Sequence, residues 1–242
     1  MAYFPDAHDP ARCNVLGPDT SNPEFERLYV DHLRKIMLVR GGNRYASKAN
    51  YNATRLEYLQ RMFPDARFII PIRKPAAHIA SLMKQHRLFC EGQQLSPRAR
   101  DHLRWIGHFE FGLDRRPING GDPQATEAVL RHWKDGEDVR GWSRYWDSIY
   151  RYLADRLDDN PALRRAALVV RFEDLCRDPY RMLRVLLDHA ELGGCDAIVQ
   201  RYSKAIRFPT YYRHSFTAEE LDIIEHETSD TARRYGYDWI NA

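Results

Sequence analysis

FPDARFIIPIRKPAAHIASLMKQHRLF, residues 63–89, is the stretch that decides the fold. Its apolar run Phe68–Ile72 has the length of a buried strand, and the apolar residues that follow recur at helical spacing. Pro75 suits the first turn of a helix, where its missing N–H costs nothing. Because a helix N-terminus attracts anions, Arg73 at the strand's end predicts a phosphate or sulfate site, to which Ser81 adds a hydroxyl.

This stretch resembles the 3′-phosphate-binding segment of the sulfotransferases that use 3′-phosphoadenosine-5′-phosphosulfate (PAPS). In that family a strand ends in Arg-Asp-Pro, a Ser follows eight residues after the Arg, and both side chains hold the 3′-phosphate. Arg73 and Ser81 match this spacing, whereas Lys74 replaces the usual Asp and makes the turn more basic. Pro71 cannot donate a ladder hydrogen bond, so we expect it at a bulge or a strand end.

A second segment, residues 171–187, also resembles this family: a strand, an aromatic-Glu-Asp-Leu corner, a Pro and a Leu-rich helix. The resemblance implies that Phe172 lies near the adenine, without the hydroxyl of the family's usual Tyr. The acidic pair at 173–174 either makes the corner or contacts the ligand. The Arg-Lys-Gly that clamps the 3′-phosphate in cytosolic members is absent, and Lys204 and Arg207 are the nearest cations.

For catalysis, the resemblance implies that Lys48 reaches the transferring sulfuryl group, where a cation stabilises the charge that develops on oxygen. Asn50 stands where cytosolic members carry a His that acts as base; it cannot take a proton but can hydrogen-bond the substrate. A hydroxyl acceptor still needs a general base. His86 is a candidate, although a surface role is the commoner one for such a histidine. The alternative for Lys48 is a solvated surface lysine.

Residues 1–47 contain nothing that reads as the Gly/Ser/Thr-rich loop with which this family binds the 5′-phosphosulfate. We therefore expect a bacterial-type, N-terminally truncated relative, similar to the family over roughly residues 22–240. It would bind PAPS and move a sulfuryl group to a hydroxyl or amine of a small-molecule or carbohydrate acceptor, weakly or not at all as this chain alone. The alternative is a non-catalytic, nucleotide-binding remnant.

Composition bounds these expectations. A chain of 242 residues, 43% hydrophobic, suits a single domain over 1–242 with coil at 1–21. It has no apolar run near 18 residues, no secretory leader pattern and no metal-like Cys/His spacing, and its four dispersed cysteines are typical of a reduced, cytoplasmic protein. Oligomeric state is not predicted.

Charge is uneven along the chain. Residues 61–104 hold nine Lys/Arg against three Asp/Glu, a net of +6, so the remainder of this +3 chain is about −3. Such a segment fits a compact polyanion, or it is a solvated helix face. A nucleic-acid binder would rest on this segment alone, without any recognisable reading motif, so we expect no nucleic-acid partner.

The predicted fold class is α/β: a parallel sheet flanked by helices, with the P-loop-like architecture that the resemblance implies. We expect strands at 44–48, 67–72 and 167–172, the first two forming a β-α-β unit around a helix capped by Asn52. A helical excursion at about 90–160 covers the sheet.

Overall fold

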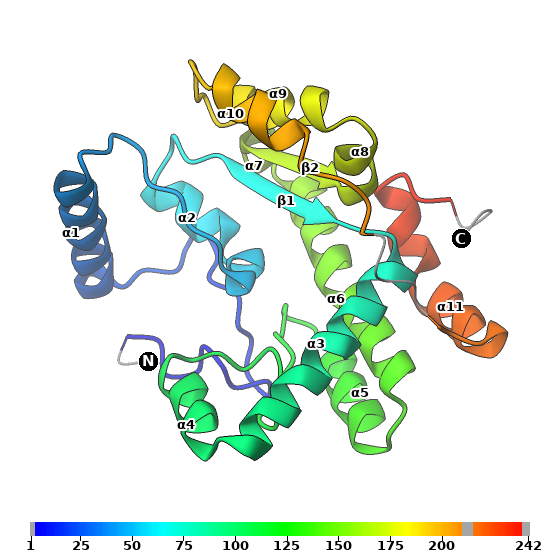
Figure 1. Ribbon diagram of the computed structural model, residues 1–242. Helices are drawn as coiled ribbons and strands as arrows, with labels where there is room; N and C mark the ends of the chain where they lie inside the picture. The colour runs from blue at the N-terminus through cyan, green and yellow to red at the C-terminus, as the bar shows by residue number, and fades with distance from the viewer. Residues whose placement is uncertain (1–2, 210–214, 239–242) are drawn as a thin grey trace.

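The computed structural model describes residues 3–209 and 215–238 and has the arrangement shown in Figure 1. The first half contains α1 (Pro23–Arg40), the 3-10 helix η1 (Asn50–Thr54), α2 (Leu56–Met62), β1 (Phe68–Ile72), α3 (Pro75–Leu95) and α4 (Pro97–Trp105). The second contains α5 (Pro123–Lys134), α6 (Asp138–Asp159), α7 (Pro161–Ala166), β2 (Ala167–Arg171), α8 (Phe172–Arg177), α9 (Pro179–His189), α10 (Asp196–Ser203) and α11 (Ala218–Arg234).

Local signals set several helix ends. The Asn22 side chain accepts from the Phe25 N–H, and Gly41 ends α1 with a left-handed φ of 62°. The side chain of Thr217 and that of Glu220 form a reciprocal capping box at the start of α11. The cap predicted at Asn52 is wrong, because Asn52 lies inside η1 and α2 begins after Arg55.

The sheet consists of β1 and β2, which pair in parallel from Phe68 opposite Ala167 to Ile72 opposite Arg171. The α/β class, with a parallel sheet flanked by helices, is therefore confirmed. Pro71 lies one residue from the end of β1, which pairs on one side only within the described residues. This agrees with the expectation that Pro71 occupies a strand end.

The strand expected at 44–48 is wrong. This polar segment is exposed and extended, and it joins no ladder. Its first residue is held through its side chain, since Arg44 Nη2 donates to the Ala190 carbonyl at 2.7 Å and Arg44 also pairs with Glu191. With only Tyr45 and Ala46 as apolar side chains, both exposed, the segment gains little from entering the sheet, so the predicted β-α-β unit does not form.

The long apolar stripe of α6 packs on one face of the sheet. Trp142, Trp146 and Leu153 are almost completely buried, as are Ile70 and Ile72 of β1. Figure 1 shows α6 behind the two strands with α3, α5 and α11 around it. The helical excursion predicted at about 90–160 thus contains α6, the helix that covers the sheet.

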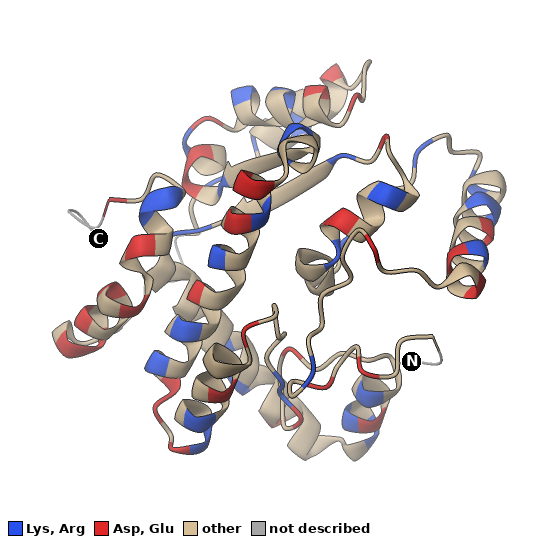
Figure 2. Ribbon diagram, turned by 180° about the vertical axis from the view of Figure 1, so that it is seen from behind, with Lys and Arg blue, Asp and Glu red and all other residues tan. Residues whose placement is uncertain are grey.

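The positive charges of the basic segment 61–104 do not form one continuous basic surface. Four of its arginines pair with carboxylates elsewhere in the chain: Arg61 with Glu26, Arg67 with Glu191, and both Arg100 and Arg104 with Asp114. Figure 2 shows basic and acidic residues interspersed along most helices. No helix in the described part of the chain is long and apolar enough to cross a membrane.

The hydroxyl of Tyr150 on α6 donates to the Pro71 carbonyl of β1 at 3.0 Å. Replacing Tyr150 by Phe leaves this carbonyl without that donor, so we expect the free energy of unfolding to fall by about 1 kcal/mol. Urea denaturation of the variant and of the exposed control Tyr180→Phe measures this. Equal stability of both variants and the wild type would contradict the assignment.

Candidate functional site

Two predicted nucleotide-binding residues meet at the carboxyl edge of the sheet. Arg73 follows β1 and Phe172 follows β2, and parallel pairing puts both strand ends at the same edge. The Arg73 guanidinium lies 4.9 Å from the centre of the Phe172 ring, over its face. In open α/β sheets ligands bind outside this edge, so the pair stands where a phosphate and a base could be held together.

The 204–209 segment also reaches this edge. The rings of Phe208 and Phe172 lie edge to face with centroids 6.5 Å apart. Arg207, beside Phe208, is exposed, and so is Lys204 at the end of α10. Phe208, the residue after Arg207, therefore contacts Phe172, whereas Lys204 lies four residues before Phe208 in the chain.

Glu173 makes the corner that follows β2. Its Oε1 accepts from the backbone N–H of Lys74 at 3.0 Å, at the N-terminus of α3, and its Oε2 accepts from the Tyr237 hydroxyl at 2.6 Å. Burial and this hydrogen bond raise the pKa of Tyr237. Asp174 pairs with Arg171 at 2.6 Å. These contacts favour the corner role that the sequence left open for the acidic pair.

Ser81 is half-buried on α3, six residues into the helix. At 1.5 Å per residue it lies about 9 Å along the axis from Pro75. The Arg73–Phe172 contact thus forms at the start of the helix, and Ser81 lies nearly two turns beyond it. The joint role of Arg73 and Ser81 remains a prediction.

The predicted transfer residues lie on a different segment. Lys48 and Asn50 are exposed, just before and at the start of η1. Asn50 Nδ2 donates to Glu110 Oε1 at 3.2 Å, and Glu110 Oε2 lies 3.1 Å from His108 Nδ1. Sequence reasoning missed this grouping, because the loop after α4 carries no periodic or motif signal that would single out either residue.

His86, the predicted base, lies thirteen residues beyond Arg73, near the middle of α3. Its Nδ1 accepts from the Gly112 N–H at 3.2 Å, and its Nε2 lies 3.6 Å from Cys90 Sγ. Burial, and secondarily the charge of Arg115, lower the pKa of His86 to about 4. The hydrogen bond from Gly112 ties the His86 ring to the loop that follows α4. The low pKa makes His86 a weak base.

His78 is a half-buried histidine on α3, close to Arg73. Trp146 Nε1, which can only donate, lies 3.1 Å from His78 Nδ1, so Nδ1 is unprotonated and the proton resides on Nε2. Burial, followed by the nearby charge of Arg73, lowers its pKa to about 4. His78 therefore joins α3 to α6 without adding charge to the interior.

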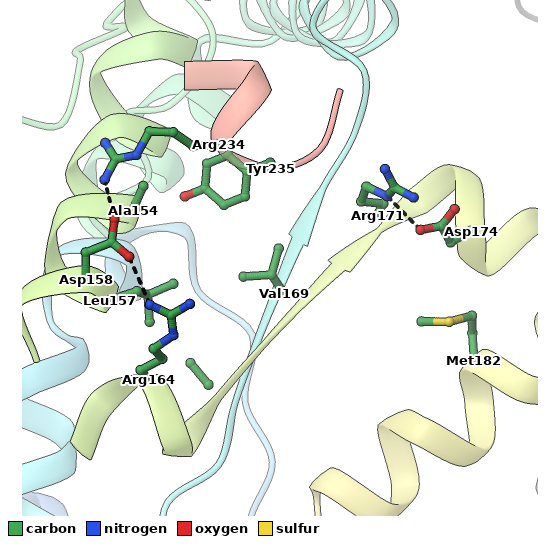
Figure 3. Close-up of a pocket in the computed structure, with 11 residues that line it drawn as sticks. Ala154, Leu157, Asp158, Arg164, Val169, Arg171, Asp174, Met182, Arg234 and Tyr235 are labelled. Carbon is green, nitrogen blue, oxygen red and sulfur yellow. Dashed lines mark hydrogen bonds and ion pairs between the residues drawn. The ribbon is translucent and has the colours of Figure 1, made fainter. Parts of the chain in front are cut away.

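A separate open pocket of about 460 Å³ lies beside β2, between α6, α9 and the end of α11 (Figure 3). Its charged lining is already paired: Arg234 and Arg164 with Asp158, and Arg171 with Asp174. None of the predicted site residues lines it. The pocket thus lacks a charge left over for an anionic nucleotide.

Residues 2–115 match the family model described as the sulfotransferase family. This match, over slightly less than half of the chain, supports membership of the sulfotransferase family. The match includes Lys48, Arg73 and Ser81 and ends before residues 171–187, whose resemblance it does not test. No curated protein and no solved structure matches this chain.

The low pKa of His78 predicts acid sensitivity. In the unfolded chain an imidazole takes a proton below about pH 6.5, whereas in the folded protein His78 does so only near pH 4. The unfolded state therefore binds more protons in this window, and stability falls as pH falls.

Replacing His78 by Gln keeps an acceptor for Trp146 and removes the titration. When the pH falls from 7.5 to 5, we expect the free energy of unfolding to decrease by on the order of 1–2 kcal/mol more in the wild type than in His78→Gln. Denaturant melts at both pH values, with exposed His226→Gln as control, test this. Parallel losses in the wild type and His78→Gln would rule the explanation out.

Proposed function

We propose that this sulfotransferase-family protein binds PAPS at the Arg73–Phe172 edge and transfers the sulfuryl group to a hydroxyl or amine acceptor. The observation that carries the proposal is the 4.9 Å contact between the Arg73 guanidinium and the Phe172 ring. It joins a cation suited to a phosphate and an aromatic face suited to adenine, from two segments ninety-nine residues apart. The family match supports sulfotransfer in general.

In this proposal Arg73 and Ser81 hold the 3′-phosphate, and Phe172 packs against the adenine. The exposed Arg207 beside Phe208 adds a second cation. Lys48 stabilises the charge that develops on the sulfuryl oxygens, and Asn50 hydrogen-bonds the acceptor. No metal is required, because these cations and dipoles supply the electrostatic stabilisation.

The second candidate is a nucleotide-binding protein without turnover. It is favoured by Glu173, whose carboxylate already occupies the Lys74 N–H at the start of α3. Both candidates share the 3′-phosphate site and differ in catalysis.

The nucleotide site is tested by calorimetry. Adenosine 3′,5′-bisphosphate should bind more tightly than AMP, because only the former carries a 3′-phosphate. We expect Arg73→Ala to weaken its binding by roughly 1.5–3 kcal/mol and Ser81→Ala by roughly 0.5–1.5 kcal/mol. The exposed Arg98→Ala serves as control. Equal affinity for the two nucleotides would refute the site.

Turnover separates the two candidates. With radiolabelled PAPS and a panel of phenol, sugar and amine acceptors, we expect this chain alone to transfer sulfuryl groups slowly. Residues 1–47 contain no Gly/Ser/Thr-rich loop whose N–H groups would bind the 5′-phosphosulfate, and loss of a single such donor costs ~10²–10³ in rate. Lys48→Ala should abolish whatever transfer occurs. Robust turnover abolished by Lys48→Ala would contradict the slow rate yet support the chemistry. Nucleotide binding with no transfer to any acceptor would favour the second candidate.

A further inference from the structure

The loop between α4 and α5, residues 106–122, is fixed by the N-terminal segment. Gly107 has a φ of +72°, and a Cβ on it would lie 2.9 Å from His8 Nε2, so only glycine fits there. Arg116 Nη1 donates to the His8 carbonyl at 3.2 Å, and the Asn119 N–H donates to Asn14 Oδ1 at 2.9 Å. A loop held at these points presents its side chains in a defined place.

This loop places a buried carboxylate against η1. Glu110 is only 9% exposed, and its Oε1 receives the Asn50 amide. Its other oxygen lies 3.1 Å from His108 Nδ1, although the two atoms are not aligned well enough for a regular hydrogen bond, and both are buried. Imperfect alignment of this kind is common in catalytic pairs before substrate binds.

The rest of the His108 ring is accessible. The His108 side chain is 31% exposed, and its Nδ1 is a buried polar atom without a hydrogen-bond partner, whereas Nε2 is not. Phe89 stacks on the ring at 5.4 Å with an interplanar angle of 15°, which fixes its plane. The imidazole thus has one nitrogen facing a carboxylate and the other facing outward.

We propose that His108 is the general base of the sulfuryl transfer and that Glu110 is its positioning residue. The inference rests on the proposed function. The acceptor oxygen or nitrogen bonds to sulfur as the bond from sulfur to the 5′-phosphate oxygen breaks, and that electron pair leaves with adenosine 3′,5′-bisphosphate. The acceptor's proton moves to His108 Nε2, and the Glu110 carboxylate, 3.1 Å from Nδ1, stabilises the imidazolium once substrate binding aligns the pair.

The place of this pair in the site carries the assignment. Glu110 binds Asn50, and Asn50 is two residues from Lys48, the residue proposed to contact the sulfuryl group. His108 is therefore joined through one carboxylate to the segment where transfer occurs. His78 and His86 instead accept hydrogen bonds at Nδ1 from Trp146 and from the Gly112 N–H. Neither has a carboxylate there to support a positive charge.

The tautomer of His108 tests the geometry without any turnover. Imidazole ¹⁵N NMR at about pH 8, where an ordinary histidine is neutral, should show His108 protonated on Nδ1. Its signals are identified by their loss in His108→Asn. Glu110→Gln keeps an acceptor for Asn50 but removes the charge, and should shift the proton toward Nε2. The exposed Glu127→Gln on α5 should change nothing. A wild-type proton on Nε2 would overturn the assignment.

Transfer kinetics test the chemistry. His108→Asn should lower kcat by ~10²–10⁴, and Glu110→Gln should lower it in the same direction, with affinity for adenosine 3′,5′-bisphosphate unchanged in both. His102→Asn, exposed on α4, is the matched control. Wild-type turnover in His108→Asn would overturn the base while leaving the proposed function intact. Failure of the wild type to prefer adenosine 3′,5′-bisphosphate over AMP would overturn the proposed function itself.

Discussion

The carboxylate of Glu173 holds the carboxyl edge of the sheet together. One oxygen takes the Lys74 N–H where β1 passes into α3, and the other takes the hydroxyl of Tyr237 after α11. Three segments distant in sequence thereby meet at the end of β2. The same carboxylate compensates the partial positive charge of the α3 N-terminus. A phosphate arriving at this edge is therefore best bound from the Arg73 side, since Arg73 forms no ion pair with the residues that the structure describes.

The proposed site has two parts, each supported by different elements of the fold. The nucleotide part stands on the strand ends, where Arg73 and Phe172 are placed by the parallel pairing of β1 and β2. The transfer part stands on η1 and on the loop after α4, through the contact of Asn50 with Glu110. The chain from Lys48 to Arg73 links the two parts through α2 and β1. Changes in the loop should alter chemistry more than nucleotide affinity.

Sequence patterns anticipated what depends on neighbours along the chain. The apolar runs of β1 and β2 are local signals, and both strands form where expected. The Asn22 cap and the capping box at Thr217 likewise depend only on residues close in sequence. The strand expected at 44–48 does not form, because its few apolar side chains offer little surface to bury. Contacts such as Asn50 with Glu110, sixty residues apart, depend on how distant segments pack, and no local pattern encodes them.

The link between Asn14 and Asn119 spans 105 residues. Closing so long a segment carries an entropic cost that local contacts avoid, so this link should be among the last to form and the first to open. The loop with His108 and Glu110 is thus completed only after the helices around it have assembled. In amide hydrogen exchange, the N-terminal segment and this loop should open together, as one cooperative unit less stable than the α6 core.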